Sequence, residues 1–474
     1  MRTRLRIRLA LLIGVLLAAG PLAAGKLTLT ILYDNDLHGH LLPFAYAEVG
    51  RGGQEKPSVG GAARRATLIR KLKKQAKNPV FLINAGDCFT RGPLATTYEG
   101  IPDVEAMNAI GYQLSAIGNN EFKAKDGVDR NDADGSKAAL QRLFKRSTFP
   151  WICANATDET GACLQGVQPY VIRQINGVKV GFLGLTAPRS ADYPQTKGWK
   201  FTDPISAAKV WIPKARADCD LLIAVTHLGV DMDRQLASQT TGIDAIFGGD
   251  SHTFLYKALE VTNPDGAKVP IFQDGEYGVN LGKADLTFDD SDHGKWRLTT
   301  CTSELIPIGP GLAEDADVTA AIAPFLRPLE KVIANIPQIQ NTPDKRMRAT
   351  TQLLVDALRL ESGADLALNP SGDGLFASFH RTQIRRYDVF EALPYKDYAV
   401  VATMTDADVK KMLKGSPQMV ISGEIGKYSD TDSIKVALVD YFAASNLPNT
   451  TVTNTDKDIR ELLIAWLQSK YPAH

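Results

Sequence analysis

Metal-ligating residue types recur in the first half of this chain, each time at the end of a short apolar stretch. The stretches lie in the segments LTLTILYDNDLHGH (27–40), PVFLINAGD (79–87), QLSAIGNNEF (113–122), DLLIAVTHLG (220–229) and IDAIFGGDSH (243–252). β-Branched and aliphatic residues dominate each stretch, which predicts five buried strands. The ligand candidates at their carboxyl ends are Asp36, His38, Asp87, Asn119, His227, Asp250 and His252.

The repetition of this placement indicates a metal centre. A single Asp after a strand is usually a turn former or a helix cap, and a single His is usually a hydrogen-bonded core residue. Five such placements favour one common site, because the carboxyl ends of strands in an α/β sheet meet at one edge. Imidazole and carboxylate ligands together suit zinc, manganese or iron better than calcium. We therefore predict two divalent transition-metal ions at this edge.

The N-terminal sequence has the pattern of a secretory signal peptide. MRTRLRIR carries four arginines and no acid, and it is followed by the apolar run LALLIGVLLAAG (9–20) and the small residues PLAAG. The apolar run is shorter than the ~20 residues that span a bilayer. We predict that residues 1–24 are removed and that the protein is periplasmic or secreted, without a stable membrane span. The alternative is a protein tethered to the membrane by an uncleaved N-terminus.

Size and charge narrow the class of partner. The chain has 474 residues and a net charge of +1, and loss of the four arginines in the predicted signal gives 1 − 4 = −3. A nearly neutral protein lacks the electrostatic footprint of a nucleic-acid-binding protein. We therefore predict a small-molecule substrate and no nucleic-acid polymer. The remaining length exceeds one usual hydrophobic core, so at least two domains are expected.

Residues 26–310 alternate predicted strands with helical patterns. GGAARRATLIRKLKKQ (60–75) has apolar residues at helical spacing and a basic opposite face. VIRQINGVKVGFLGLT (171–186) has an Asn-Gly pair between two alternating stretches, which predicts a β-hairpin. The first of at least two domains is therefore expected to end near residue 310.

The pattern changes after residue 310. LAEDADVTAAIAPFLRPLEKVIANI (312–336) predicts an interdomain helix interrupted by two prolines, within a linker over 311–339. A second α+β unit is expected over 340–474.

Five cysteines in an exported chain predict up to two disulfides and one free thiol. Cys153 and Cys163 flank a turn-rich loop and are the expected pair. Cys88 directly follows Asp87, where it is either a small buried hydrophobe or a further metal ligand.

The segments NDLHGH, NAGD, GNNEF, THLG and GGDSH occur in an order that resembles the bacterial 5′-nucleotidase and cyclic-phosphodiesterase group of calcineurin-like metallophosphoesterases. Further resemblance lies in QDGEYGVNLGKADL (273–286), LLVDALRLESGADLALNPSG (353–372) and TQIRRYDVFEALPYKD (382–397). The resemblance implies an α/β fold (an α+β sandwich), with a four-layer metallophosphoesterase domain over 26–310. A smaller α+β domain of the 5′-nucleotidase C-terminal type would follow.

The resemblance also implies two ligand sets that share one carboxylate. The first ion would be held by Asp36, His38, Asp87 and His252. The second would be held by Asp87, Asn119, His227 and Asp250. Two ions bridged in this way activate a hydroxide for in-line attack at phosphorus, so the implied substrate is a small phosphate ester, with nucleotides among the candidates. His40 would be a hydrogen-bonding residue behind the ligands, and it is also a candidate proton donor.

The catalytic positions of the chain depart from the family pattern. The family carries a His after its ligand Asn and an orienting Asp three residues later, where this chain has Asn120 and Lys123. An amide cannot supply the proton that general acid catalysis requires, a contribution worth about 10²–10⁴ in rate. Asp250 also stands where the family has a His ligand, and a carboxylate adds negative charge there.

The C-terminal unit departs from the family as well. Asn369 is followed by PSGDG, without the glycine-rich run and the Arg that grips phosphate in the family. The family's base-stacking segment near the C-terminus is also absent. The nearest substitutes are Arg381, Arg385, Arg386 and Tyr395. We take Asn369, Arg381 and Tyr395 as the candidate substrate-binding residues.

Two classes of function remain open from the sequence. The leading interpretation is an exported dinuclear phosphoesterase that hydrolyses phosphate esters. The alternative is a degenerate relative that binds metal and a ligand or partner without turnover, which the loss of both dyad residues favours. Retention of seven ligand candidates favours the enzyme, because clustered acids and imidazoles destabilise a fold unless a cation neutralises them. A third option is another metal hydrolase, such as a thiosulfate-releasing relative.

Overall fold

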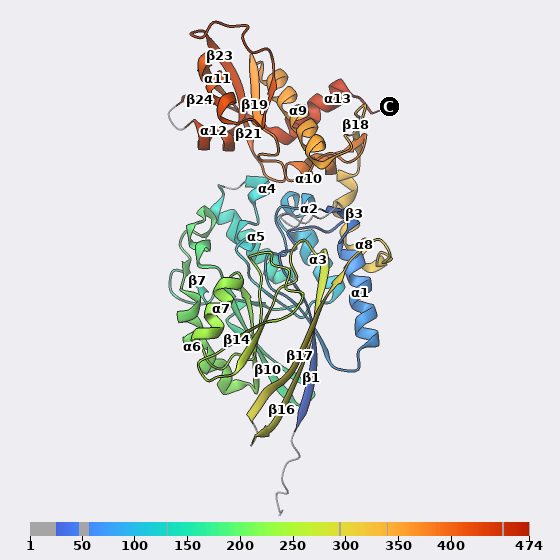
Figure 1. Ribbon diagram of the computed structural model, residues 1–474, viewed down its shortest axis with the longest axis vertical. Helices are drawn as coiled ribbons and strands as arrows, with labels where there is room; N and C mark the ends of the chain where they lie inside the picture. Colours follow the sequence, from blue (N-terminus) through green and yellow to red (C-terminus); the bar gives the residue numbers. More distant parts are fainter. Residues whose placement is uncertain are drawn as a thin grey trace, which may run out of the picture.

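The chain folds into two units that lie end to end, as the computed structural model shows (Figure 1). The structure describes residues 25–46, 56–129, 131–292, 295–338, 340–447 and 450–473. The predicted signal peptide therefore lies outside the described residues. Among the residues that are described, no helix combines the length and the apolar character needed to cross a bilayer.

Two sheets pack face to face in the N-terminal unit. The first has the strand order β17 (Lys295–Pro307), β16 (Asn280–Asp292), β1 (Lys26–Asp34), β4 (Val80–Asn84), β5 (Leu114–Ala116), β6 (Trp151–Ile152) and β8 (Val167–Gln168). The second has the order β14 (Leu259–Thr262), β15 (Lys268–Phe272), β13 (Ala245–Phe247), β12 (Leu221–His227), β10 (Val178–Thr186) and β9 (Tyr170–Ile175). All five predicted ligand-bearing strands are present, three in one sheet and two in the other.

Helices cover the outer faces of both sheets and complete four layers. The first sheet is covered by α1 (Ala62–Gln75), α3 (Ile101–Ile110), α5 (Ala133–Arg146) and α8 (Ala316–Leu326). The second is covered by α6 (Pro204–Asp218) and α7 (Val230–Gln239). Alternation along β1 explains the layering, because Leu29 and Ile31 face the second sheet while Leu32 packs under the helices. The predicted four-layer architecture is confirmed.

The hairpin predicted from the Asn-Gly pair is also confirmed. Strands β9 and β10 are antiparallel, with Ile175 paired to Val178. Asn176 and Gly177 both have positive φ (50° and 87°), as a two-residue turn with the right twist requires. The hairpin delivers the carboxyl end of β10 to the edge of the sheet where the ligands lie.

The C-terminal unit is a smaller α+β domain, as predicted. Its five-stranded sheet has the order β22 (Met419–Ser422), β19 (Leu366–Pro370), β23 (Ser433–Val439), β21 (Tyr398–Thr405) and β24 (Val452–Asp458). Its helices are α9 (Pro343–Ser362), α10 (Arg386–Ala392), α11 (Asp406–Gly415), α12 (Asp440–Asn446) and α13 (Ile459–Lys470). The domain has its own hydrophobic core, to which α9 and α13 contribute. This core is separate from the cores of the N-terminal unit.

The single interdomain helix predicted over 312–336 is wrong in extent. Helix α8 ends at Leu326, a 3₁₀ turn over Arg327–Leu329 follows, and the chain then forms strand β18 (Val332–Asn335). Pro328 lies in the first turn of the 3₁₀ segment, where its missing N–H costs nothing, so it marks a boundary rather than a kink. Helix α8 packs on the N-terminal core, whereas β18 pairs with β20 (Gln383–Arg385) of the C-terminal unit.

Contacts between the two units are both polar and apolar, and they lie close to the ligand-bearing loops. The buried Arg460 of α13 donates a hydrogen bond to the carbonyl of Gly127 at 3.1 Å. Helix α10 packs against α2 (Pro93–Thr97). Helix α2 begins five residues after Cys88, the residue that directly follows the ligand candidate Asp87. The C-terminal unit therefore sits over the edge that carries the predicted metal ligands (Figure 1).

The predicted disulfide between Cys153 and Cys163 is wrong, because all five cysteines are free thiols. Cys153 is buried at the end of β6, and its thiol donates to the Asn155 side chain at 3.6 Å. Hydrogen bonds close the loop without a disulfide. Asp158 accepts from the backbone N–H of Ala162 at 3.0 Å, among others.

Candidate metal centre

Asp36, His38 and His252 form the first group of converging ligand atoms. The Asp36 Oδ1 atom lies 3.7 Å from His38 Nε2 and 3.2 Å from His252 Nε2. The two imidazole nitrogens are 3.2 Å apart. All three atoms lie close enough to one another for a single cation to contact them together. The structure thus brings together the predicted ligands from β1 with those that follow β13.

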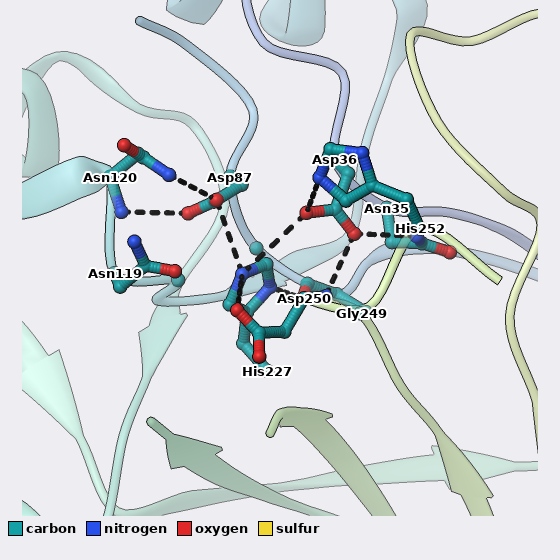
Figure 2. A network of polar contacts seen from close by, with 12 residues as sticks. Asn35, Asp36, Asp87, Asn119, Asn120, His227, Gly249, Asp250 and His252 are labelled. Carbon is teal, nitrogen blue, oxygen red and sulfur yellow. Dashed lines mark hydrogen bonds and ion pairs between the residues drawn. The ribbon is translucent and has the colours of Figure 1, made fainter. Parts of the chain in front are cut away.

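Asp36, Asp87 and His227 form a second group beside the first. His227 Nε2 lies 3.2 Å from Asp87 Oδ2 and 3.7 Å from Asp36 Oδ1. The same Asp87 oxygen is 3.6 Å from His38 Nε2, so it faces both groups. Asp250 Oδ1 also lies 3.7 Å from His227 Nε2. Figure 2 shows the side chains of Asp36, Asp87, Asp250 and His252 gathered around His227.

The chemistry of these atoms fits a divalent transition-metal ion. Asp36 Oδ1 and His227 Nε2 are fully buried and have no hydrogen-bond partner within the described part of the chain. Buried polar atoms are nearly always paired, because an unpaired one loses its hydration without compensation. Both unpaired atoms point to the same space, next to Asp87. A cation that binds carboxylate and imidazole would pair them, and the observed spacing requires no rearrangement of the fold.

Hydrogen bonds behind the ligands fix which atoms face the centre. The His227 ring bonds the carbonyl of Ala85 through Nδ1 at 2.8 Å, and His252 bonds Glu276 through Nδ1. Each ring thereby presents Nε2 to the centre, the arrangement that metal-binding histidines adopt. The Asp36 Oδ2 atom accepts from Asn35 Nδ2 at 2.7 Å, which leaves Oδ1 to face the ligands.

The raised pKa values of two histidines show that negative charge dominates the centre. Burial lowers the pKa of His252, but the nearby Asp36 carboxylate and the hydrogen-bonded Glu276 carboxylate outweigh it and raise that pKa to about 10. Burial likewise opposes protonation of His227, and Asp87 and Asp36 raise its pKa well above the usual value. Without a bound cation, protons on the imidazoles therefore compensate the carboxylates. A metal ion would do the same and release those protons.

Backbone strain marks the ligand positions. Five of the predicted ligands are non-glycine residues with positive φ: Asp36 (51°), His38 (47°), Asp87 (54°), Asp250 (85°) and His252 (52°). This left-handed conformation is uncommon for residues with a Cβ, and each case costs of order 1–3 kcal/mol. Such a concentration persists only where the surrounding structure holds it. Here it turns successive ligand side chains toward one point.

Asn120 and Glu121 hold the ligand loops, and only the first was singled out from the sequence. Asn120 donates to both oxygens of Asp87, from its backbone N–H at 2.7 Å and from Nδ2 at 2.5 Å. The buried Glu121 carboxylate accepts from the backbone N–H groups of Asp87 (2.9 Å), Cys88 (2.8 Å) and Gly118 (2.6 Å). It therefore ties the loop after β4 to the loop after β5. The sequence feature that could have pointed to this role is the position of Glu121, an acidic residue directly after the predicted ligand segment GNN.

Cys88 does not face the ligand cluster. Its Sγ atom is 3.3 Å from Glu121 Oε1, and burial raises the pKa of the thiol well above its usual value. A neutral thiol bonded to a carboxylate is a poor metal ligand, because the thiolate is the binding form. The structure favours the small-hydrophobe interpretation of this residue.

Lys123 and His40 have different surroundings next to the ligands. Lys123 Nζ is 3.4 Å from the Asn120 Oδ1 atom and 4.0 Å from the centre of the Tyr193 ring. His40 stacks on Tyr277, with ring centres 4.2 Å apart, and burial lowers the pKa of its imidazole to about 4. Lys123 is thus a cation at the rim, whereas His40 is neutral and packed behind the ligands.

Asn119 and Asp250 face an arginine that sequence analysis missed. Arg189 donates to Asp250 Oδ2 from Nη1 at 2.8 Å and to Asp250 Oδ1 from Nη2. The same Nη2 donates to Asn119 Oδ1 at 3.0 Å. Asn119 Nδ2 in turn donates to the Tyr193 hydroxyl at 3.0 Å. The segment APRSADYP after β10 carried no metal-ligand residue type at the strand end, so no local pattern pointed to it.

The three substrate-binding candidates of the C-terminal unit are not brought together. Asn369 is buried and uses its Nδ2 to bond the carbonyls of Pro370 (2.9 Å) and Asp373 (2.8 Å), so it shapes its own loop. Arg381 lines a cavity of about 340 Å³ beside β18, where it lies 3.5 Å from an Asp388 carboxylate oxygen. Tyr395 is the one of the three that interacts with a ligand-bearing loop of the other unit.

That interaction involves Arg91, a second cation that sequence analysis missed. Arg91 lies four residues after Asp87 and forms side-chain hydrogen bonds with Tyr395 and Tyr277. Its charge also contributes to lowering the pKa of His38, after burial, so the guanidinium lies close to the first ligand group. Arg91 is therefore a positive group between the metal-binding edge and the C-terminal unit.

Comparison with known proteins agrees with the two-unit architecture. Residues 29–254 match the calcineurin-like phosphoesterase family, and residues 332–459 match the 5′-nucleotidase C-terminal domain. The chain is 25% identical to the trifunctional nucleotide phosphoesterase protein YfkN of Bacillus subtilis over 85% of its own length, and 30% identical to the 5′-nucleotidase of Bos taurus over 65%. It spans only 28% and 54% of those two relatives.

A solved structure shows the same fold over nearly the whole chain. The 5′-nucleotidase precursor from Thermus thermophilus superimposes with a TM-score of 0.71 at 23% identity, covering 94% of this chain and 97% of that one. The sulfate thiohydrolase SoxB of the same genus superimposes with a TM-score of 0.65 at 17% identity, covering 93% and 94%. At these identities the likeness establishes the fold alone.

Replacement of Glu121 by Gln tests its role in holding the ligand loops. The amide would present an N–H₂ group to backbone N–H donors, so at least one buried donor would lose its partner. We expect the free energy of unfolding to fall by about 1–3 kcal/mol, measured by urea denaturation of the metal-free protein. Glu105→Gln, which removes a partly exposed carboxylate paired with Arg146, is the control. Equal stability of the two variants would contradict this role.

Proposed function

Because the chain combines a calcineurin-like phosphoesterase domain with a 5′-nucleotidase C-terminal domain, we propose that it hydrolyses small phosphate esters with divalent transition-metal ions. The observation that carries the proposal is a pair of buried atoms without a hydrogen-bond partner in the described part of the chain, Asp36 Oδ1 and His227 Nε2, which converge with an oxygen of Asp87. An arrangement of this kind is costly for a fold unless a cation occupies it.

We propose that two ions share the Asp87 carboxylate. Asp36, His38, Asp87 and His252 would hold the first ion, and Asp87, Asn119, His227 and Asp250 would hold the second. When bound, such ions supply Lewis acidity and lower the pKa of water at neutral pH. The protein's own contribution is orientation, since Glu276 fixes the His252 ring and Asn35 fixes the Asp36 carboxylate.

Arg91 supplies the positive charge that an anionic substrate requires. The proposed phosphate site lies between the first ligand group and the C-terminal unit, where Arg91 bonds Tyr395 and Tyr277. A guanidinium can donate two hydrogen bonds to one phosphate, which gives both affinity and orientation. Arg91 would thereby take over the role for which the sequence suggested Arg381.

Nucleotides are among the proposed substrates, although the aromatic surface available to a base is small. Tyr395 meets Phe376 edge to face, with ring centres 5.4 Å apart, and Phe376 is 49% exposed. An exposed ring of this kind can stack on a base, a contact worth about 1–3 kcal/mol. Two rings at right angles do not form a parallel slot, so we expect weak discrimination between bases.

Export is part of the proposal. The charged start, the short apolar run and the small residues that follow it in positions 1–24 support a cleaved signal and a periplasmic or secreted protein. The Thermus structure with the same fold is likewise described as a precursor.

Metal content tests the proposal directly. Protein purified without chelator and dialysed against Mn²⁺ or Zn²⁺ should contain close to two ions per chain by elemental analysis. Asp87→Asn should lose both, because the shared carboxylate contributes to each ligand set. Asp244→Asn is the control, since Asp244 is a carboxylate that pairs with Arg216 away from the centre. A content near zero in the saturated wild-type protein would refute the proposal.

The residue at position 120 predicts a preference for good leaving groups. Asn120 has no proton to donate, so aryl phosphates should be hydrolysed faster than alkyl or nucleoside phosphates. Asn120→His should raise kcat on alkyl phosphates by up to ~10²-fold and change aryl phosphates much less. Asn120→Ala controls for loss of the side-chain bond to Asp87. An unchanged preference in the His variant would indicate that Lys123 or His40 supplies the proton.

Loss of Arg91 should weaken substrate binding more than turnover. A charge-assisted hydrogen bond is worth roughly 1.5–3 kcal/mol, so Arg91→Gln should lower kcat/KM by about 10- to 100-fold, mostly through KM. Steady-state kinetics with one aryl phosphate measure this. Arg70→Gln, which removes an exposed arginine paired with Asp315, should leave kinetics unchanged. A normal KM in the Arg91 variant would show that phosphate is held elsewhere.

A further inference from the structure

Arg189 contacts two proposed ligands of the second ion at once. It lies in the 3₁₀ turn η2 (Pro188–Asp192), immediately beyond the carboxyl end of β10. Both of its terminal nitrogens donate to the Asp250 carboxylate, and Nη2 also donates to the Asn119 amide oxygen at 3.0 Å. The guanidinium therefore binds the oxygens that a cation would use at these two residues.

The ligands proposed for the first ion have different partners. In the described part of the chain, their side-chain hydrogen bonds run to Asn35, Asn120, Glu276, the backbone N–H of Asp250 and one another. None of these contacts comes from an arginine or a lysine. The two halves of the centre thus differ, because the Arg189 guanidinium hydrogen-bonds ligand oxygens of the second set, whereas no arginine or lysine hydrogen-bonds the first set within the described residues.

We propose that the Arg189 guanidinium stands in the place of the second metal ion and competes with it for Asp250 and Asn119. This inference rests on the proposed function, since it concerns the same two ligand sets. Binding of the second ion requires Arg189 to release a carboxylate held through both oxygens. The two ions therefore bind in order, the first tightly and the second weakly.

The presence of an aspartate at position 250 supports competition between Arg189 and the second ion. A guanidinium pairs bidentately with a carboxylate, because the two planar groups match in geometry and opposite charge. The imidazole that the family pattern has at this position offers neither feature. Arg189 and Asp250 are thus a matched pair, and the hydrogen bond to Asp250 is the main cause that raises the pKa of Arg189 above its usual value.

The Arg189 side chain is also able to move away from Asp250 and Asn119. Its side chain is 49% exposed, and it extends from a short turn at the surface rather than from a strand. Release costs charge-assisted hydrogen bonds, but water can solvate the freed guanidinium. Lys123 lies nearby, over the Tyr193 ring that also bonds Asn119, so the local charge opposes the second ion even after release.

Calorimetric titration of Mn²⁺ into the metal-free, full-length protein tests the competition. The wild type should show two events, with the second at least about tenfold weaker than the first. Arg189→Gln should tighten the second event at least about tenfold and leave the first within about twofold. Asp250→His, which keeps a ligand but removes the partner of the guanidinium, should tighten the second event in the same direction.

Arg216→Gln is the matched control, because Arg216 donates to the Asp244 carboxylate at 2.6 Å, far from the centre. It should reproduce the wild-type titration. Circular dichroism checks that each variant is folded, and Asp250→His provides a second test if Arg189→Gln is not. An unchanged or weaker second event in both folded variants would overturn the proposal. Absence of any binding in all four proteins would refute the proposed function as well, so the two failures are distinguishable.

Discussion

Concentrated negative charge in a dry environment is the constraint on which this structure depends. Asp36 and Asp87 are almost completely buried, and they lie within 3.7 Å of the same imidazole nitrogens of His38 and His227. Carboxylates at such a site repel one another unless positive charge compensates them. Protons on the histidines, a guanidinium or metal ions can each provide it. The surrounding fold must hold the ligands together whichever of these is present.

The apolar core between the two sheets provides that rigidity. Ligands of the first group come from both sheets, so their spacing depends on how the sheets pack. Tyr33 of β1 meets Phe247 of β13 edge to face at 5.0 Å, directly behind the ligand loops of both strands. Phe247 also stacks on Phe272 at 4.6 Å. Close packing of large rings resists sliding, so it fixes the relative position of Asp36 and His252 without touching either.

Local sequence patterns were sufficient to predict the strands and the ligands that follow them. A buried strand ending at Asp, Asn or His is visible within ten residues, and its direction in a parallel sheet determines where its end lies. The four layers required the family resemblance, because periodicity alone does not show which sheet a strand joins. The extent of the helix after residue 310 was missed because proline was read as an interruption rather than a boundary.

The residues that sequence analysis missed act over long separations. Arg189 is 61 positions from Asp250, and Arg91 meets Tyr395 from another domain. A basic residue in a loop has no local feature that distinguishes it from a solvated surface charge. The predicted Cys153–Cys163 bond failed for a related reason, since spacing in sequence cannot show that hydrogen bonds already close the loop. Glu121 was accessible in principle, because it directly follows a ligand segment.

The departures from the family pattern become coherent when they are considered together. Where the family resemblance implies a catalytic His, the chain has Asn120, whose two donors bond Asp87. Where it implies a ligand His, the chain has Asp250, which pairs with Arg189. At both positions, the side chain that stands in place of an imidazole forms hydrogen bonds with other residues of the protein. Protein contacts thereby stabilise Asn119 and Asp250 of the second ligand set, whereas Asp36 Oδ1 and His227 Nε2 have no hydrogen-bond partner within the described residues. A centre built in this way can keep one ion bound tightly while the occupancy of the other responds to metal concentration.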